Sequence, residues 1–159
     1  MNSSAKQRGF TIVELLIVIV VIGILAAITI VAYNGIQDRS KFARARSDFN
    51  AMQKGLEMYK ANYGAYPLTP SDGWIWSNNS PTGYIPGIVP EFANSLPIIT
   101  DGTGMYLYRS TGGVEYKIIK HKSGGIVAGE WDQVPASMKD QYIANKDRYG
   151  VWSSGGSAL

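Results

Sequence analysis

Gly9-Phe10-Thr11-Ile12-Val13-Glu14, with the apolar run behind it, is the stretch that decides how this chain folds. From Leu15 to Ala32 there is no charged residue, and only Gly23 and Thr29 interrupt the aliphatic residues and alanines. A helix over this run would be about 27 Å long, close to the ~30 Å hydrocarbon core of a bilayer. The sequence therefore predicts a transmembrane helix from Leu15 to Ala32.

Glu14 stands directly in front of this apolar run. An acidic residue inside a membrane helix costs up to about 3 kcal/mol, and less near the helix ends. A carboxylate at this position therefore indicates a specific role.

The residues around Glu14 resemble the start of a type IV prepilin or a type II secretion pseudopilin. Members of that family have a short basic leader that ends in glycine, followed by phenylalanine, a small residue, two aliphatic residues and glutamate. Here the leader is residues 1–9 and carries Lys6 and Arg8. The resemblance implies that prepilin peptidase cleaves after Gly9, removes the leader and methylates the new amino group of Phe10.

An ordinary signal anchor, or a secretory signal peptide cut behind the apolar run, is the alternative. No A-x-A-like cleavage site stands between Ala26 and Gly35. The order of Gly9, Phe10 and Glu14 is also not required by an ordinary signal. The prepilin interpretation is therefore favoured, and a single-pass anchored protein stays a remote alternative.

The charged residues suggest an orientation. Lys6 and Arg8 favour a cytoplasmic N-terminus, although Arg39 and Lys41 beyond the span weaken the asymmetry. The rest of the chain would then be extracytoplasmic, first in the cytoplasmic membrane and later in a filament. The net charge of +3 falls to +1 (13 − 12) without the leader, so whole-chain charge does not indicate a nucleic-acid partner. The absence of cysteine excludes a disulfide and differs from many Gram-negative major pilins.

Beyond residue 35 the helix becomes one-sided. Its apolar residues follow spacings of three and four and predict a stripe that packs on a sheet: Phe42, Ala45, Phe49, Met52, Leu56, Tyr59 and Tyr63. No proline interrupts residues 10–66, and Gly64 suits a helix C-cap. Gly64-Ala65-Tyr66-Pro67 also resembles the G-x-Y-P segment that follows the long helix in major pseudopilins and many short pilins.

A long loop and a small sheet are expected next. Prolines, glycines and three aromatic anchors (Trp74, Trp76 and Tyr84) are typical of a loop connecting helix and sheet. Thr111-Gly112-Gly113 predicts a hairpin between strands 105–110 and 114–120, and 126–128 is a candidate third strand. Helix-compatible residues follow at 137–145.

The expected fold is therefore α+β and pilin-like: one long N-terminal helix packed on an antiparallel sheet of about three strands, with a long αβ-loop. The expected divisions are a leader (1–9), a transmembrane and filament-core helix (10–35), and a globular head (36–159). The head comprises an amphipathic helix (36–63), a loop (64–104), a sheet (105–131) and a C-terminal segment (132–159).

Catalytic motifs are largely missing from the sequence. His121 is the single histidine, and no G-x-S-x-G elbow is present, so the chain is expected not to be an enzyme. No cofactor is expected. Calcium is bound by major pseudopilins in the strand and loop region, but the nearby acids lack the D-x-D spacing of a hard-cation site and are read as solvated: Asp101, Glu115, Glu130 and Asp132.

A local basic cluster accompanies the strands: Arg109, Lys117, Lys120 and Lys122, together with His121. It could attract DNA phosphates. Lysines that keep a solvated strand edge from pairing with other strands are the more frequent case.

The resemblance also implies a mechanism and partners. In the family the glutamate meets the N-terminal amine of a neighbouring subunit, and this head-to-tail contact builds an open helical filament. Implied partners are further copies of the chain, minor pilins or pseudopilins, prepilin peptidase, an inner-membrane assembly platform with its ATPase, and membrane lipid before assembly. Two functions stay open at this point: a surface pilus for adhesion, motility or DNA uptake, and a pseudopilus that drives protein export.

Overall fold

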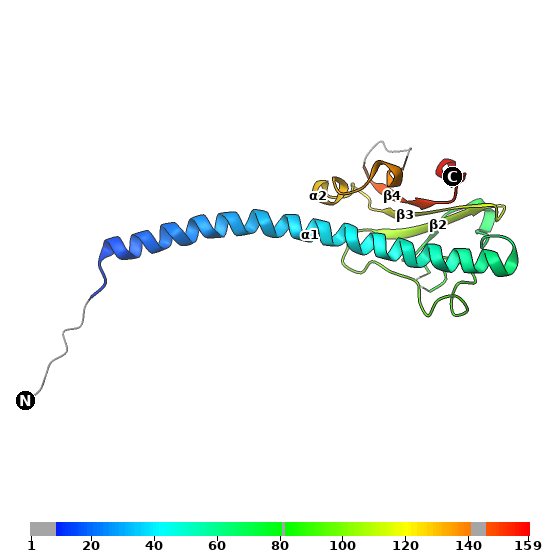
Figure 1. Ribbon diagram of the computed structural model, residues 1–159, viewed down its shortest axis with the longest axis horizontal. Helices are drawn as coiled ribbons and strands as arrows, with labels where there is room; N and C mark the ends of the chain where they lie inside the picture. The colour runs from blue at the N-terminus through cyan, green and yellow to red at the C-terminus, as the bar shows by residue number, and fades with distance from the viewer. Residues whose placement is uncertain (1–8, 81, 141–145) are drawn as a thin grey trace, which may run out of the picture. The chain divides into compact units, whose positions relative to one another are not determined.

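A computed structural model of the chain describes residues 9–80, 82–140 and 146–159. The chain divides into two compact units between Gln37 and Asp38. Helix α1, Ile12–Tyr63, is 52 residues long and runs through this division (Figure 1). It begins at Ile12 rather than at Phe10, and its end agrees with the prediction. Gly64 follows with a φ of +79°, and its N–H donates to the carbonyl of Lys60 at 2.8 Å, as in an αL C-cap.

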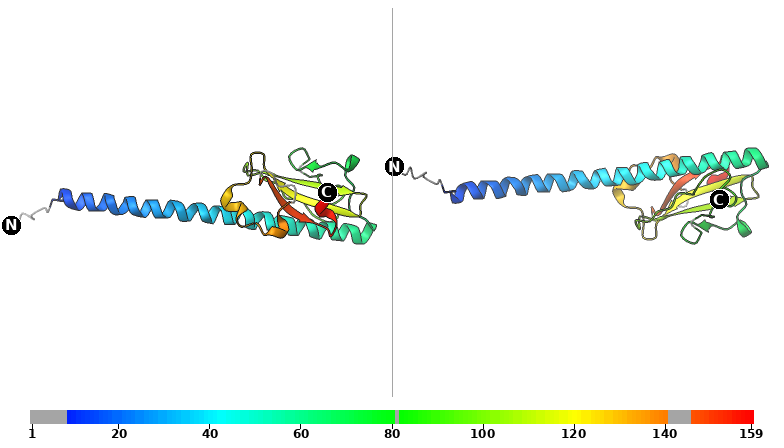
Figure 2. Two further views of the ribbon diagram at one scale, coloured as in Figure 1. Left: turned by 90° about the horizontal axis from the view of Figure 1, so that it is seen from above. Right: turned by 90° about the horizontal axis from the view of Figure 1, so that it is seen from below.

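Four antiparallel strands form one sheet in the order β1-β2-β3-β4. After α1 the elements follow in the chain order η1 (Pro70–Asp72), β1 (Ile75–Trp76), β2 (Met105–Thr111), β3 (Glu115–His121), α2 (Ala128–Trp131), η2 (Ala136–Met138), β4 (Arg148–Trp152) and η3 (Gly156–Ala158). Within the second unit the sheet lies along one side of α1 (Figure 2). The predicted α+β pilin-like fold is confirmed.

The β2–β3 hairpin forms where the sequence predicts it. Gly112 and Gly113 adopt φ values of +60° and +69°, which a tight hairpin turn of this hand requires and which other residues rarely adopt. Thr111 pairs with Glu115 directly behind the turn.

The prediction of a third strand at residues 126–128 is wrong. The backbone N–H of Ile126 donates to the carbonyl of Lys146, but the chain then turns into α2 at Ala128. This turn brings Glu130 to a buried lysine of β3. The third and fourth positions of the sheet belong to β3 and β4, and β1 is an additional edge strand inside the predicted loop.

β4 lies against β3 so closely that its Gly150 has no room for a side chain. An added Cβ there would clash with the backbone of Ile118 and Ile119. Residues 137–145, which were considered for a helix, contain only the end of η2 among the described residues. Residues 141–145 lie outside the part that the structure describes.

The apolar stripe of α1 faces the core over most of its length. Ala45, Phe49, Met52 and Leu56 are buried, together with Gly55, which the stripe did not include. Phe42 and Tyr59 are partly buried and pack against the same core, whereas Tyr63 is 56% exposed. The Phe49 ring meets Tyr106 and Tyr149 from the sheet edge-on, with centroids 5.6 and 5.9 Å apart.

Tyr84 is the anchor of the long loop. It is fully buried, and its hydroxyl donates to the carbonyl of Pro97 at 2.7 Å. The same buried core contains three further apolar residues of the loop, Ile85, Ile88 and Leu96. Trp76 is 39% exposed and meets the ring of His121 edge-on instead of pinning the loop to the core.

Two lysines of β3 are buried, which corrects the prediction of a solvated basic edge. Lys117 and Lys120 are 0% and 2% exposed, and β3 is an interior strand of the sheet. Lys117 Nζ lies 3.1 Å from Asp140 Oδ1, and Lys120 Nζ lies 2.6 Å from Glu130 Oε1. Glu130 also accepts a hydrogen bond from the Tyr149 hydroxyl at 2.7 Å. Burial and this hydrogen bond raise the pKa of Tyr149, so the hydroxyl keeps its proton as a donor.

Glu130→Ala should destabilise the head strongly, because it leaves the Lys120 ammonium buried without its counter-charge. Breaking a buried pair in this way costs about 3–5 kcal/mol. Lys120→Met combined with Glu130→Gln removes both charges and keeps an acceptor for Tyr149, so most of the stability should return. Thermal unfolding of the detergent-solubilised chain, followed by circular dichroism, measures both. A double variant as unstable as Glu130→Ala would contradict the pairing.

Candidate functional site

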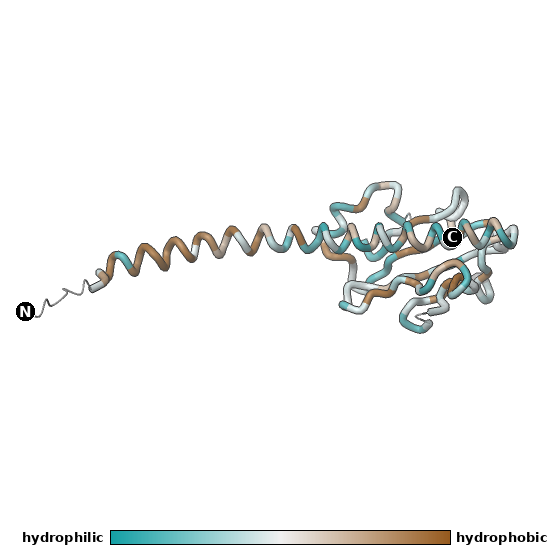
Figure 3. Tube along the Cα trace, turned by 60° about the horizontal axis from the view of Figure 1, so that its bottom comes forward, coloured by the Kyte–Doolittle hydropathy of each residue, from teal (hydrophilic) through white to brown (hydrophobic). Residues whose placement is uncertain are grey.

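The N-terminal part of α1 exposes an apolar surface. All large aliphatic side chains from Ile12 to Val31 are exposed, from 48% at Val21 to 85% at Ile12. In the hydropathy colouring of Figure 3 this stretch is mostly brown, that is, mostly apolar. Among the described residues α1 is the one helix that is long and apolar enough to cross a membrane, and none of its most apolar window is buried. Such a surface needs lipid or protein around it.

Glu14 and Thr11 form a capping box at the start of α1. Thr11 precedes the first helical residue, and its N–H and hydroxyl both donate to Glu14 Oε2 at 2.8 Å. The N–H of Glu14 donates back to Thr11 Oγ1 at 3.2 Å. This reciprocal arrangement satisfies the otherwise unpaired N–H groups of a helix start. The resemblance implies the N-terminal amine of a neighbouring subunit as the partner of Glu14, and within this chain the Thr11 N–H and hydroxyl bind its carboxylate.

The second carboxylate oxygen of Glu14 is not used by the capping box. Oε1 accepts no hydrogen bond from any described residue, and Glu14 lies on the exposed surface. A carboxylate can accept several hydrogen bonds, so a cation approaching from outside can bind Oε1 without opening the cap. The signal for the cap is the Thr-x-x-Glu spacing, which the sequence analysis did not use.

Gly9 and Phe10 are exposed in front of the helix. Phe10 is 85% exposed, and a Cβ added at Gly9 would meet no described atom within 4 Å. The fold of this chain therefore imposes no requirement for glycine at position 9. Residues 1–8, including Lys6 and Arg8, lie outside the described residues.

The predicted basic cluster is not brought together by the fold. Lys117 and Lys120 are three residues apart on one strand, so their side chains leave opposite faces of the sheet, and both are buried in ion pairs. Arg109 and Lys122 are half-buried, and Arg109 Nε has no hydrogen-bond partner among the described atoms. A shared phosphate-binding surface of these four residues is therefore excluded.

The four acids that were weighed as calcium ligands do not form a group. Among the described residues, no three His, Cys, Asp or Glu side chains lie close enough to hold a metal ion. Glu130 was expected to be a solvated charge and is instead buried beside Lys120. Asp101 accepts hydrogen bonds from the N–H and hydroxyl of Thr103 at 2.9 and 2.6 Å, which lower the pKa of its carboxyl group.

Comparison with known proteins identifies the N-terminal segment. Residues 4–30 match the family model for the prokaryotic N-terminal methylation motif. The chain is 39% identical over 69 residues to the type II secretion system core protein G of Escherichia coli K12, covering 43% of this chain and 48% of that protein. It is 35% identical over 69 residues to the core protein G of Vibrio cholerae, covering 43% of this chain and 47% of that protein.

The match to these two relatives spans about half of their length. A longer match is found with the type II secretion system core protein G of Dickeya chrysanthemi, which is 29% identical over 153 residues, or 96% of this chain and 91% of that protein. No solved structure matches the chain. The chain therefore carries a prepilin-type N-terminal methylation motif on a pilin-like α+β fold, and it is similar to the core protein G of type II secretion systems.

Proposed function

We propose that this chain is a structural subunit of a helical filament, of the type II secretion pseudopilus kind, and that it assembles through α1. The observation that carries the proposal is the exposed apolar surface of residues 12–31 with Glu14 at its front. The methylation motif and the similarity to core protein G along most of the chain support it. A surface pilus is the second function that the sequence leaves open.

Processing comes first in this proposal. Prepilin peptidase cleaves after Gly9 and methylates the amine of Phe10, both of which lie on an exposed stretch before the helix. The subunit then waits as a single-pass protein in the cytoplasmic membrane, with its N-terminus on the cytoplasmic side and its head outside. The apolar side chains between Leu15 and Ala32 lie in lipid at this stage.

Assembly exchanges lipid for neighbouring helices. In a bundle of apolar helices the charge of Glu14 is costly unless it is paired. The capping box occupies Oε2, and Oε1 is available for the N-terminal amine of a neighbouring Phe10. The cap thus orients the Glu14 carboxylate, and the neighbour's amine neutralises its charge. A subunit therefore fits only in the position in which this carboxylate and amine pair. Minor pseudopilins, the assembly platform and its ATPase are the further partners in this proposal.

The processing step predicts a defined mature N-terminus. Intact mass spectrometry of protein extracted from membranes should show a chain that begins at Phe10 and carries an N-methyl group. Gly9→Val should stay full length, and Gly9→Ala tests how small the residue must be for the peptidase. Because a Cβ at position 9 meets no described atom within 4 Å, both variants should fold normally. A mature N-terminus beyond Ala32 would show ordinary signal-peptide cleavage instead.

The assembly step predicts that the charge of Glu14 is required in addition to its cap. Glu14→Gln keeps an acceptor for the Thr11 N–H, since a capping box accepts glutamine, but removes the charge. We expect cleavage and membrane insertion to persist, while the yield of sheared filaments falls to background for both Glu14→Gln and Glu14→Ala. Normal filaments from processed Glu14→Gln would assign Glu14 to the cap alone and exclude the pairing mechanism.

Deleting the gene separates the two filament functions. A pseudopilus subunit should be needed for release of exported proteins into the medium, which then accumulate inside the envelope. Complementation with the native chain should restore release, and complementation with Glu14→Gln should not. Unchanged export together with loss of surface filaments and of twitching or DNA uptake would establish the pilus function instead.

A further inference from the structure

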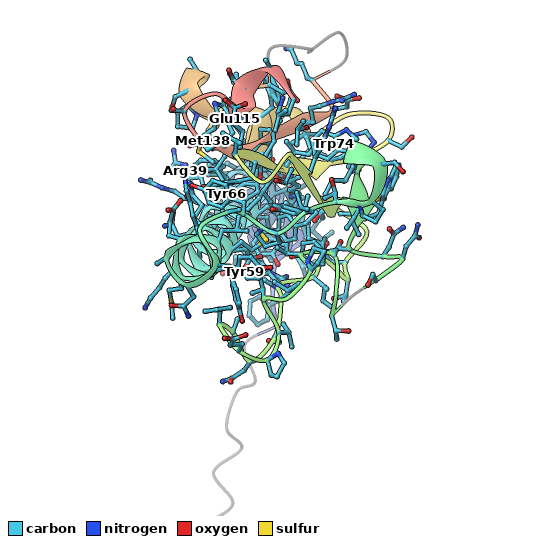
Figure 4. All side chains as sticks on the ribbon, turned by 90° about the vertical axis from the view of Figure 1, so that its right-hand side faces the viewer. Arg39, Tyr59, Tyr66, Trp74, Glu115 and Met138 are labelled. Carbon is cyan, nitrogen blue, oxygen red and sulfur yellow. The ribbon has the colours of Figure 1, made fainter. Side chains whose placement is uncertain are left out.

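A polar cleft of about 560 Å³ opens at the end of the head where α1 finishes. Its walls come from α1, from the start of β3 and from the residues behind β4, and they include Gln53, Glu57, Tyr66, Glu115, Tyr116 and Trp152. Figure 4 looks at this end of the head and labels Tyr66 and Glu115. The cleft plays no part in the assembly mechanism described above.

The charges of the cleft favour a cation. Glu57 is exposed and accepts a hydrogen bond from the Tyr66 hydroxyl at 2.9 Å. Glu115 is half-buried beside Gly155, and its carboxylate makes no hydrogen bond or ion pair with a described residue. The ammonium group that lines the cleft, that of Lys60, already lies over the Tyr66 ring, 4.3 Å from its centroid. A partly desolvated carboxylate without a partner gains most from a cation that arrives from outside.

An exposed arginine stands on the same side of α1 as Glu57. At about 100° per residue, the step of 11 residues from Arg46 to Glu57 returns the side chain to nearly the same direction, about 16 Å further along the helix. Arg39 lies one heptad before Arg46 on the same line. Both arginines are exposed and form no ion pair with a described residue, whereas Lys41 is paired with Asp38 at 2.9 Å.

We propose that in the filament this cleft receives the guanidinium of Arg46 from a second copy of the chain, and this inference rests on the proposed function. Carboxylates match the donor geometry of arginine, and the half-buried ring of Trp152 lines the cleft beside them, where a planar guanidinium can pack. Arg39 extends the positive potential of the same helix face and helps to attract the cleft.

The contact uses two different surfaces, so it is heterologous. The cleft of each subunit is filled by one neighbour while its own Arg46 fills the cleft of another. Such a contact does not form a closed dimer. It can repeat along an open helix, as the proposed contacts of the N-terminal helices do. The head would therefore provide a second contact that fixes the position of each subunit relative to its neighbour, independently of Glu14.

Charge reversal tests this contact in the full-length chain. Arg46→Glu and Glu115→Lys should each lower the yield of sheared filaments by at least about tenfold, because like charges then face each other. The double variant restores opposite charges and should recover most of the native yield. Lys146→Glu reverses an exposed cation outside the cleft and the helix line, and should leave the yield unchanged. Normal filaments from both single variants, or no recovery in the double variant, would overturn the proposal.

Cross-linking tests the same contact with smaller changes to the surface. Because the chain contains no cysteine, introduced pairs can react only with each other. Ser154→Cys at the rim of the cleft, combined with Asn50→Cys one turn from Arg46, should give a ladder of multimers on oxidation of filaments. Ser154→Cys with Asn79→Cys is the matched control and should give none.

The two proposals fail in different ways. Filaments that form and yield no ladder with the Asn50 pair would contradict the Arg46 contact alone. A native chain that is processed and stable but forms no filament would contradict the proposed function.

Discussion

The unburied apolar surface of residues 12–31 is the constraint on which the rest of the structure depends. No described part of the chain covers these side chains, although each large aliphatic residue that leaves water gains about 1.5–3 kcal/mol. These side chains must therefore always be covered by something outside the chain, first by lipid and then by other helices in the proposed assembly. The capping box at Thr11 and Glu14 is compatible with both, because it closes the helix start without a partner and leaves one carboxylate oxygen unused.

The parts of the fold that repeat locally could be predicted from the sequence. The helix, its C-cap at Gly64 and the β2–β3 hairpin follow from residue spacing and from glycine at positive φ, and the structure has all of them. Strand β4 could not be predicted with the same ease, because its five residues include Gly150, and only the approach of β3 explains why glycine is needed there. The Thr-x-x-Glu spacing of the Thr11 cap is visible in the sequence. The long apolar run directly behind it indicates a membrane span more strongly than a helix cap, so Glu14 is interpreted from the run and not from the cap.

Buried charges show where sequence reasoning fails. In β3 the lysines at 117 and 120 look like solvated residues, since lysine is rarely buried unless it is paired. Their partners Asp140 and Glu130 stand 23 and 10 residues further along the chain, and no local pattern indicates that they fold back onto the sheet. The predicted basic cluster is therefore two internal ion pairs and two separate, half-buried residues, Arg109 and Lys122.

These ion pairs have a consequence for where the head can fold. They hold the segment between β3 and β4 against the sheet. In small exported domains a disulfide often makes this kind of link. A lysine and a carboxylate need no oxidant, no isomerase and no particular thiol balance to find each other. The head can thus reach its final structure in a reducing or anoxic environment as readily as in an aerated one, and reductants should leave its stability unchanged.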